Sequence, residues 1–149
     1  MRSEIETRKL AAIWSLRATL RPKAFDNFSQ HSPSDACVLR LAGLENLIQC
    51  PVSDGKIKAL LQHQLKEIET PMPSRRGPLF QSVDRLGKMM GLTTADQEIF
   101  LFALLIGEEE GLEQAIDNLG MLSMKQLARE LSHILKIKPA DIVKGLHRS

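Results

Sequence analysis

Apolar residues recur at spacings of three and four along most of this chain, which is the pattern of amphipathic helices. The first segment shows it simply, with Ile13, Leu16 and Leu20 on one stripe ahead of Pro22. Aromatic residues are scarce: the 149 residues include one Trp, five Phe and no Tyr. A core of Leu, Ile, Ala and Met favours packed helices over β-sheets. We therefore predict an all-α multi-helix bundle, with room for a short strand only near residues 120–123 or 137–138.

A proline-rich stretch divides the chain into two predicted subdomains. Residues 70–78, Thr-Pro-Met-Pro-Ser-Arg-Arg-Gly-Pro, hold three prolines and a glycine, and a helix cannot continue through them. We predict an N-terminal helical subdomain over residues 1–70, a linker over 71–78 and a second helical subdomain over 79–149. Three helices are expected before the linker, and Arg75 and Arg76 are expected to be solvated within it.

The second subdomain is predicted to be built around one strongly apolar helix. Residues 99–106, Ile-Phe-Leu-Phe-Ala-Leu-Leu-Ile, are apolar on nearly every side of a helix, and a strand is the less favoured interpretation of so short a run. Thr94, with Gln97 three residues later, has the form of a capping box at the start of this helix. The residues expected in the core of this half are Phe80, Met89, Met90, Phe100 and Leu104; a groove for a partner is the less favoured interpretation of Met89, Met90 and Phe80.

Residues 122–149 have the parts of a helix-turn-helix unit. Ser123 and Gln126 have capping-box spacing ahead of one amphipathic helix, and Pro139 suits the first turn of a second. The predicted connection, residues 132–138, has no glycine and is longer than the turn of roughly three or four residues found in DNA-reading motifs. We predict a degenerate winged-helix or helix-turn-helix-like end.

Basic side chains at this end are candidate contacts for nucleic acid or for a partner protein. They are Lys136, Lys138, Lys144, His147 and Arg148. The alternative is a solvated helix face with no ligand, and Asp141 in the first turn of the last helix opposes DNA binding. Residues 93–120 hold seven Asp and Glu and no Lys or Arg, so they would also repel a phosphate backbone. Nucleic acid is therefore a less favoured partner than protein.

The sequence predicts no catalytic, cofactor or metal site. It has no Gly-rich loop ending in Gly-Lys-Ser/Thr, and no nucleophile has an evident base and orienting acid. Glu130 and His133 have Glu-x-x-His spacing but no second pair in the chain. His63 and Glu67 stand four apart without further ligands. We expect a protein that is not an enzyme.

The sequence also predicts a cytoplasmic protein without membrane contact. Its longest apolar stretch is far shorter than the ~20 residues that cross a bilayer. Its first twenty residues carry scattered charges rather than a secretory signal. Cys37 and Cys50 are expected to be buried thiols with no disulfide between them.

Three features follow one another from Gly77 onward: a leucine-rich helix, the phrase Gly91-Leu92-Thr93 ahead of an apolar helix over 98–106, and a degenerate winged-helix unit over 122–146. This order resembles the region that precedes the motor domain in a group of bacterial AAA+ ATPases. The resemblance implies a noncatalytic N-terminal module that contacts a partner or substrate protein, or the ATPase core of the same polypeptide, or that controls assembly into a homo-oligomer. It also implies a fragment that stops before any Walker motif, so no ATP-binding residue is carried over. The alternative function is a DNA-binding regulator that uses residues 136–148.

Overall fold

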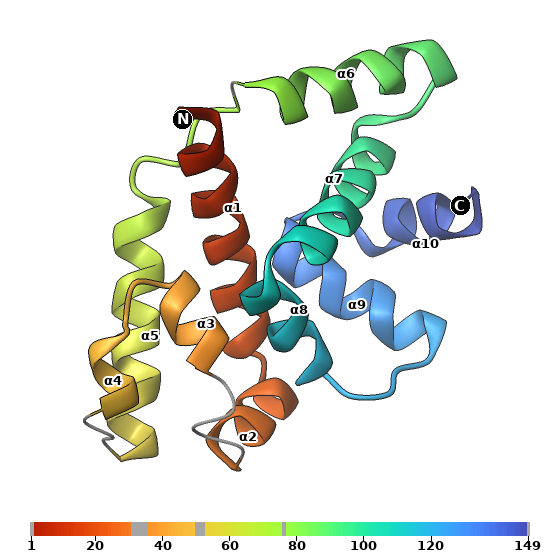
Figure 1. Cartoon of the computed structure of the whole chain (residues 1–149). Helices are drawn as coiled ribbons and strands as arrows, with labels where there is room; N and C mark the ends of the chain where they lie inside the picture. The colour runs from red at the N-terminus through yellow and green to blue at the C-terminus, as the bar shows by residue number, and fades with distance from the viewer. Residues whose placement is uncertain (1, 31–35, 50–52, 76, 149) are drawn as a thin grey trace.

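The protein is helical throughout the part of the chain that its computed structural model describes (Figure 1). The described residues are 2–30, 36–49, 53–75 and 77–148. Within these ranges there is no strand, and residues 120–123 and 137–138 connect helices. The all-α prediction is confirmed. Among the described helices, none combines the length and the apolar content needed to cross a bilayer.

The first seventy residues form more helices than predicted. They are α1 (Arg2–Thr19), α2 (Pro22–Gln30), α3 (Ala36–Leu41), α4 (Asn46–Gln49) and α5 (Asp54–Glu69). The prediction of three helices was wrong for two physical reasons. Pro22 begins a helix, a position where its missing N–H and fixed φ cost nothing. Gly43, with φ of 78°, ends the apolar run of residues 38–48 partway and separates α3 from α4.

The second half forms the helices that the periodicity predicts. They are α6 (Pro78–Met90), α7 (Thr94–Glu108), α8 (Glu110–Asp117), α9 (Met124–Leu135) and α10 (Pro139–Arg148). Ser123 and Gln126 form the predicted capping box of α9. The capping box of α7 lies one residue earlier than predicted: the Thr93 hydroxyl accepts from the Asp96 N–H, and the Asp96 carboxylate accepts from the Thr93 N–H. Gln97 is therefore not the reciprocal partner.

Helix α1 is enclosed by other helices over much of its length. All residues from Leu10 to Leu16 are buried, and α1 packs against α3, α5, α8 and α9. Alanines at 11, 12 and 18 let neighbouring helices approach closely from several sides. The Trp14 ring lies edge-on against Phe102 of α7, with 5.6 Å between the ring centroids. One hydrophobic core thus contains residues from both sides of the 71–78 segment.

The expected core residues of α6 and α7 divide into buried and exposed sets. Phe80 is buried and Leu104 is partly buried, but Phe100 is 38% exposed. Met89 and Met90 are 76% and 68% exposed, so their prediction as core residues was wrong. Helix α6 lies at the edge of the molecule and packs mainly on α7, which leaves the far side of α6 in solvent (Figure 1). The core residues of α7 are instead Leu101, Phe102 and Leu105.

Two arginines at the end of α1 and just after it connect the helices across the core. The Arg17 Nη2 lies 2.9 Å from Glu69 Oε2 of α5, and its Nη1 donates to the carbonyl of Ile134 in α9 at 2.8 Å. The Arg21 Nε lies 2.6 Å from Glu130 Oε2 of α9. Both pairs are partly buried, so solvent screens them less than a surface pair. These contacts hold the last turn of α5 against α1, and they hold α9 against the end of α1 at both Glu130 and Ile134.

Candidate functional site

The connection between α9 and α10 is shorter than the sequence predicts. Helix α9 continues to Leu135, because Leu131, Ile134 and Leu135 are all buried along one stripe. Only residues 136–138 join it to α10, and Lys136, with φ of 58°, takes the left-handed conformation that a glycine usually supplies. The prediction of a long connection over 132–138 was therefore wrong. Helix α10 packs against both α9 and α7.

The predicted basic site is divided between this turn and the last helix. Lys136 and Lys138 are exposed in the turn. Lys144 is exposed on α10 and lines a shallow cavity of about 360 Å³ with Asp96, Asp141 and residues 93–95. Two carboxylates therefore lie near Lys144, which lowers its value as a phosphate contact. The side chains of His147 and Arg148 lie outside the described residues.

A second basic row on α9 was missed by the sequence reasoning. Lys125, Arg129 and His133 follow one another at four-residue spacing, and all three are exposed. The one acidic residue of α9, Glu130, is turned toward Arg21. The four-residue spacing was visible in the sequence, but only the burial of the opposite stripe shows that this face is in solvent.

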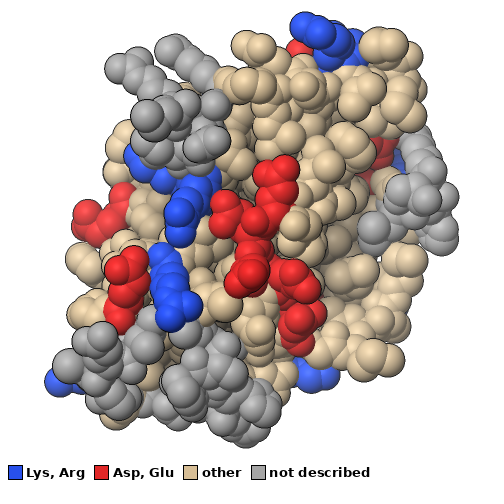
Figure 2. Space-filling view, viewed as in Figure 1, with Lys and Arg blue, Asp and Glu red and all other residues tan. Residues whose placement is uncertain are grey.

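The acidic residues of 93–120 have different environments. Asp96 caps α7, and Glu98 forms an ion pair with Arg75, whose Nη2 lies 3.0 Å from Glu98 Oε2. The others lie at the end of α7 and on α8, where Figure 2 shows acidic side chains gathered on one face. Arg75 is exposed, as predicted, and this ion pair also holds it to α7; Arg76 lies outside the described residues.

The two residue pairs with metal-ligand spacing, Glu130 with His133 and His63 with Glu67, do not form metal sites in the described structure. Glu130 is occupied by Arg21, and His63 lies 3.8 Å from Glu67 on an exposed face of α5. No group of three or more His, Cys, Asp or Glu among the described residues could hold a metal ion. Cys37 is a free, partly exposed thiol with its Sγ 3.8 Å from Glu110 Oε2, so its prediction as buried was wrong. Cys50 lies outside the described residues.

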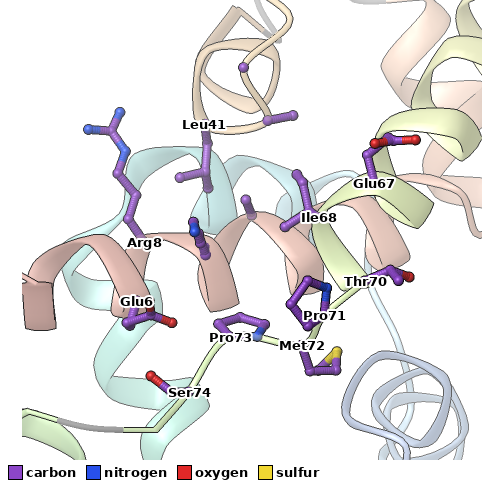
Figure 3. Close-up of a pocket in the computed structure, with 14 residues that line it drawn as sticks. Glu6, Arg8, Leu41, Glu67, Ile68, Thr70, Pro71, Met72, Pro73 and Ser74 are labelled. Carbon is purple, nitrogen blue, oxygen red and sulfur yellow. The ribbon is translucent and has the colours of Figure 1, made fainter.

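A groove of about 700 Å³ lies between α1, the end of α3 and the end of α5 (Figure 3). It is open to solvent. Small or apolar side chains form most of its surface, and charged residues of α1 and α5 stand around them. The lining residues are Glu6, Arg8, Lys9, Ala12, Leu41, Ala42, Gly43, Glu67, Ile68, Thr70, Pro71, Met72, Pro73 and Ser74.

The local sequence explains why this site is hollow. Ala12 and Ala42 are buried alanines whose short side chains leave space between α1 and α3. The segment after α5 cannot form a helix because of its prolines, so it runs as an extended fourth wall along residues 70–74, beside the three helices (Figure 3). Met72 on this wall is half exposed. Each contributing segment looks like ordinary core or linker in the sequence, which is why the groove was not predicted.

The walls of the groove are held by polar contacts outside the apolar surface. The Gln64 Nε2 on α5 donates to the Ala42 carbonyl at 2.8 Å, which ties the end of α3 to α5. The Arg17–Glu69 ion pair ties the last turn of α5 to α1. The three helices that line the groove are thus connected to one another without a ligand.

The fold and the groove define the class of protein only as an all-helical protein with an open apolar groove. Comparison with known proteins finds no matching family model, no matching curated protein and no matching solved structure.

Proposed function

We propose that this chain is a noncatalytic helical interaction module that binds a segment of a partner protein in the groove between α1, α3 and α5. The observation that carries the proposal is the apolar surface of that groove, open to solvent and surrounded by charged side chains. Its volume falls in the range of ~300–1,000 Å³ that ligand-binding pockets occupy. The resemblance of residues 77–146 to the region ahead of AAA+ motors supports a place for this module beside such an ATPase, with the motor or its substrate as the source of the bound segment.

The side chains of the groove suit a peptide better than a reaction. Proline and methionine line its extended wall, and methionine adapts its shape to different apolar partners. The charged groups belong to exposed or partly exposed residues around that surface, where they can orient a peptide. A groove with these properties binds apolar side chains and reads the charges beside them.

A peptide-display selection on the immobilised chain tests this function. Ser74→Trp places a large ring at the groove, and Ser82→Trp places the same ring on the exposed face of α6, away from it. We expect selected peptides to bind the wild type and Ser82→Trp alike and to bind Ser74→Trp at least about tenfold more weakly, which is the effect of losing roughly 1.4 kcal/mol of contact. Peptides that bind all three equally would show that the groove is not the binding site. Circular dichroism establishes that both variants are folded.

A second candidate function is nucleic-acid binding by α9 and α10, because the turn between them is short and α9 carries a basic row. The test is fluorescence anisotropy with duplex DNA at low and physiological salt. Replacing Lys125, Arg129 and Lys136 by Ala would reduce the salt slope by about one unit per lost phosphate contact. Replacing the exposed Lys56, Lys58 and Lys66 of α5 is the matched control. We expect weak binding that disappears at physiological salt; tight, sequence-selective binding there would favour this second function.

A further inference from the structure

The charges around the groove are arranged with opposite signs at different places. Arg8 extends from α1 beside Leu41, whereas Glu67 stands on α5 near Ile68 and Thr70 (Figure 3). Glu6, also on α1, lies near Pro73 and Ser74 (Figure 3). Arg8, followed directly by Lys9 on α1, is therefore the labelled cation beside the end of α3 in Figure 3, whereas the carboxylates lie beside the end of α5 (Glu67) and beside the 70–74 segment (Glu6, two residues before Arg8).

The positive end has charge to offer to a ligand. Arg8 and Lys9 are both exposed, and neither forms an ion pair with another described side chain. Glu67 at the other end has only the exposed His63 at 3.8 Å, a distance typical of weak surface pairs. Partly desolvating Arg8 and Lys9 under an apolar ligand without an anion beside them would cost free energy. A ligand with a carboxylate at that position avoids this cost.

Resting on the function proposed above, we propose that the occupant is a partner peptide with a defined charge order: apolar residues over Ala12, Leu41, Ile68 and Met72, an acidic residue at the Arg8–Lys9 end, and a basic residue at the Glu67 end. The apolar residues supply affinity by burying surface. The two flanking charges fix the direction in which the peptide lies, since the reverse direction places like charges together. The groove is in this way a reader of charge order as well as of apolar content.

Three synthetic peptide libraries test the charge order on the intact chain. Each has the same randomised apolar centre; the first is flanked by Glu before it and Lys after it, the second by Lys before and Glu after, and the third by Ser on both sides. We expect one of the two charged libraries to be enriched at least about threefold over both the other charged library and the serine library, because rim ion pairs contribute modestly and repulsion adds to the difference. Enrichment should shrink as salt is raised, because the charges are exposed.

Charge reversal in the protein provides the decisive comparison. In Arg8→Glu/Lys9→Glu, we expect binders from the preferred library to lose about tenfold in affinity. Changing their Glu to Lys should restore binding to this variant. Lys56→Glu/Lys66→Glu makes the same change in net charge on α5 outside the groove, and it should leave binding unchanged.

The outcomes separate the two proposals. If the selected peptides are lost in Ser74→Trp but bind Arg8→Glu/Lys9→Glu as tightly as the wild type, the charge order is overturned and the groove remains the binding site. If every selected peptide binds Ser74→Trp as tightly as it binds the wild type, both proposals are overturned. If the Lys56→Glu/Lys66→Glu control weakens binding as much as the groove variant, the effect is one of net charge, and the charge order is again overturned.

Discussion

Individual glycines mark where helices distant in sequence come into direct contact. A Cβ added to Gly111 of α8 would lie 2.7 Å from the Cys37 carbonyl oxygen and 2.8 Å from the Leu41 Cβ of α3. A Cβ on Gly145 of α10 would lie 2.6 Å from Ile99 Cδ1 of α7. The sequence identifies these residues as glycines inside helices but gives no indication of the backbone they touch, because the contacting atoms belong to other segments.

Gly111→Ala should destabilise the protein, although alanine is the better helix former. The backbone carbonyl of Cys37 cannot move aside as a flexible side chain can, so α8 must shift from α3, at an overpacking cost of about 1–3 kcal/mol. Gly107→Ala is the control, since nothing lies within 4 Å of its added Cβ, and it should stabilise by about 0.4–1 kcal/mol. Urea unfolding of both variants measures the difference. Equal effects of the two substitutions would contradict the close α3–α8 approach.

Leu105→Ala and Phe100→Ala should lower the free energy of unfolding by clearly different amounts, although both residues belong to the same apolar run. Leu105 is fully buried, and its truncation should cost about 2–5 kcal/mol through lost burial and a cavity. Phe100 keeps more than a third of its surface in solvent, so its truncation leaves less of a cavity and should cost less than that of Leu105. Thermal unfolding of the two variants is the measurement. A larger loss for Phe100→Ala would place Phe100 in the core, as the sequence alone predicts.

At the scale of helices, the sequence predicts which helices form better than it predicts where each helix begins and ends. All the helices after the linker were expected from spacing, caps and prolines, because these are local properties of the chain. The break between α3 and α4 was not, and the connection between α9 and α10 was predicted to be longer than it is. Each depends on one residue in left-handed conformation, Gly43 or Lys136, and a lysine gives no sequence indication of that conformation.

The register of the α7 cap can be tested with two neighbouring threonines. Thr93→Ala removes the hydroxyl that accepts from the Asp96 N–H and should cost about 0.5–2 kcal/mol. Thr94→Ala is the matched control and should be close to neutral, because Thr94 is an exposed first helical residue. Chemical denaturation of the pair decides the register. The opposite order of costs would restore the Thr94–Gln97 capping box that the sequence predicts.

At the scale of the whole molecule, the arrangement of helices was beyond the reach of the sequence. Helix α1 looks like an ordinary amphipathic segment, yet α3, α5, α8 and α9 all pack on it. The groove likewise requires α1, α3, α5 and the 70–74 segment to meet, and no single segment carries a pattern for it. The predicted division at 71–78 rests on local composition, which reports where helices stop and not which helices share a core.

The shared core makes a specific prediction for cooperativity. The one tryptophan of the chain, Trp14, lies before the 71–78 segment. Its ring packs against the ring of Phe102, which lies after that segment, with 5.6 Å between the ring centroids. Unfolding of the second half would remove the surface on which Trp14 is packed. We therefore expect Trp14 fluorescence and far-ultraviolet circular dichroism to follow the same single transition in urea, as they do for a two-state domain.

Phe102→Leu tests directly whether the two halves of the chain unfold as one unit. It removes an edge-to-face contact worth about 0.5–1.5 kcal/mol beyond burial, while keeping an apolar side chain in the core. If both halves unfold as one unit, the substitution should move the fluorescence midpoint and the dichroism midpoint to lower urea by the same amount. If residues 1–70 and 79–149 are independent subdomains, dichroism should separate into two phases, and only the phase of the second half should carry the full shift. Separate phases would support the division that the sequence predicts, because the Trp14–Phe102 contact would then be an interface between two cores rather than part of one.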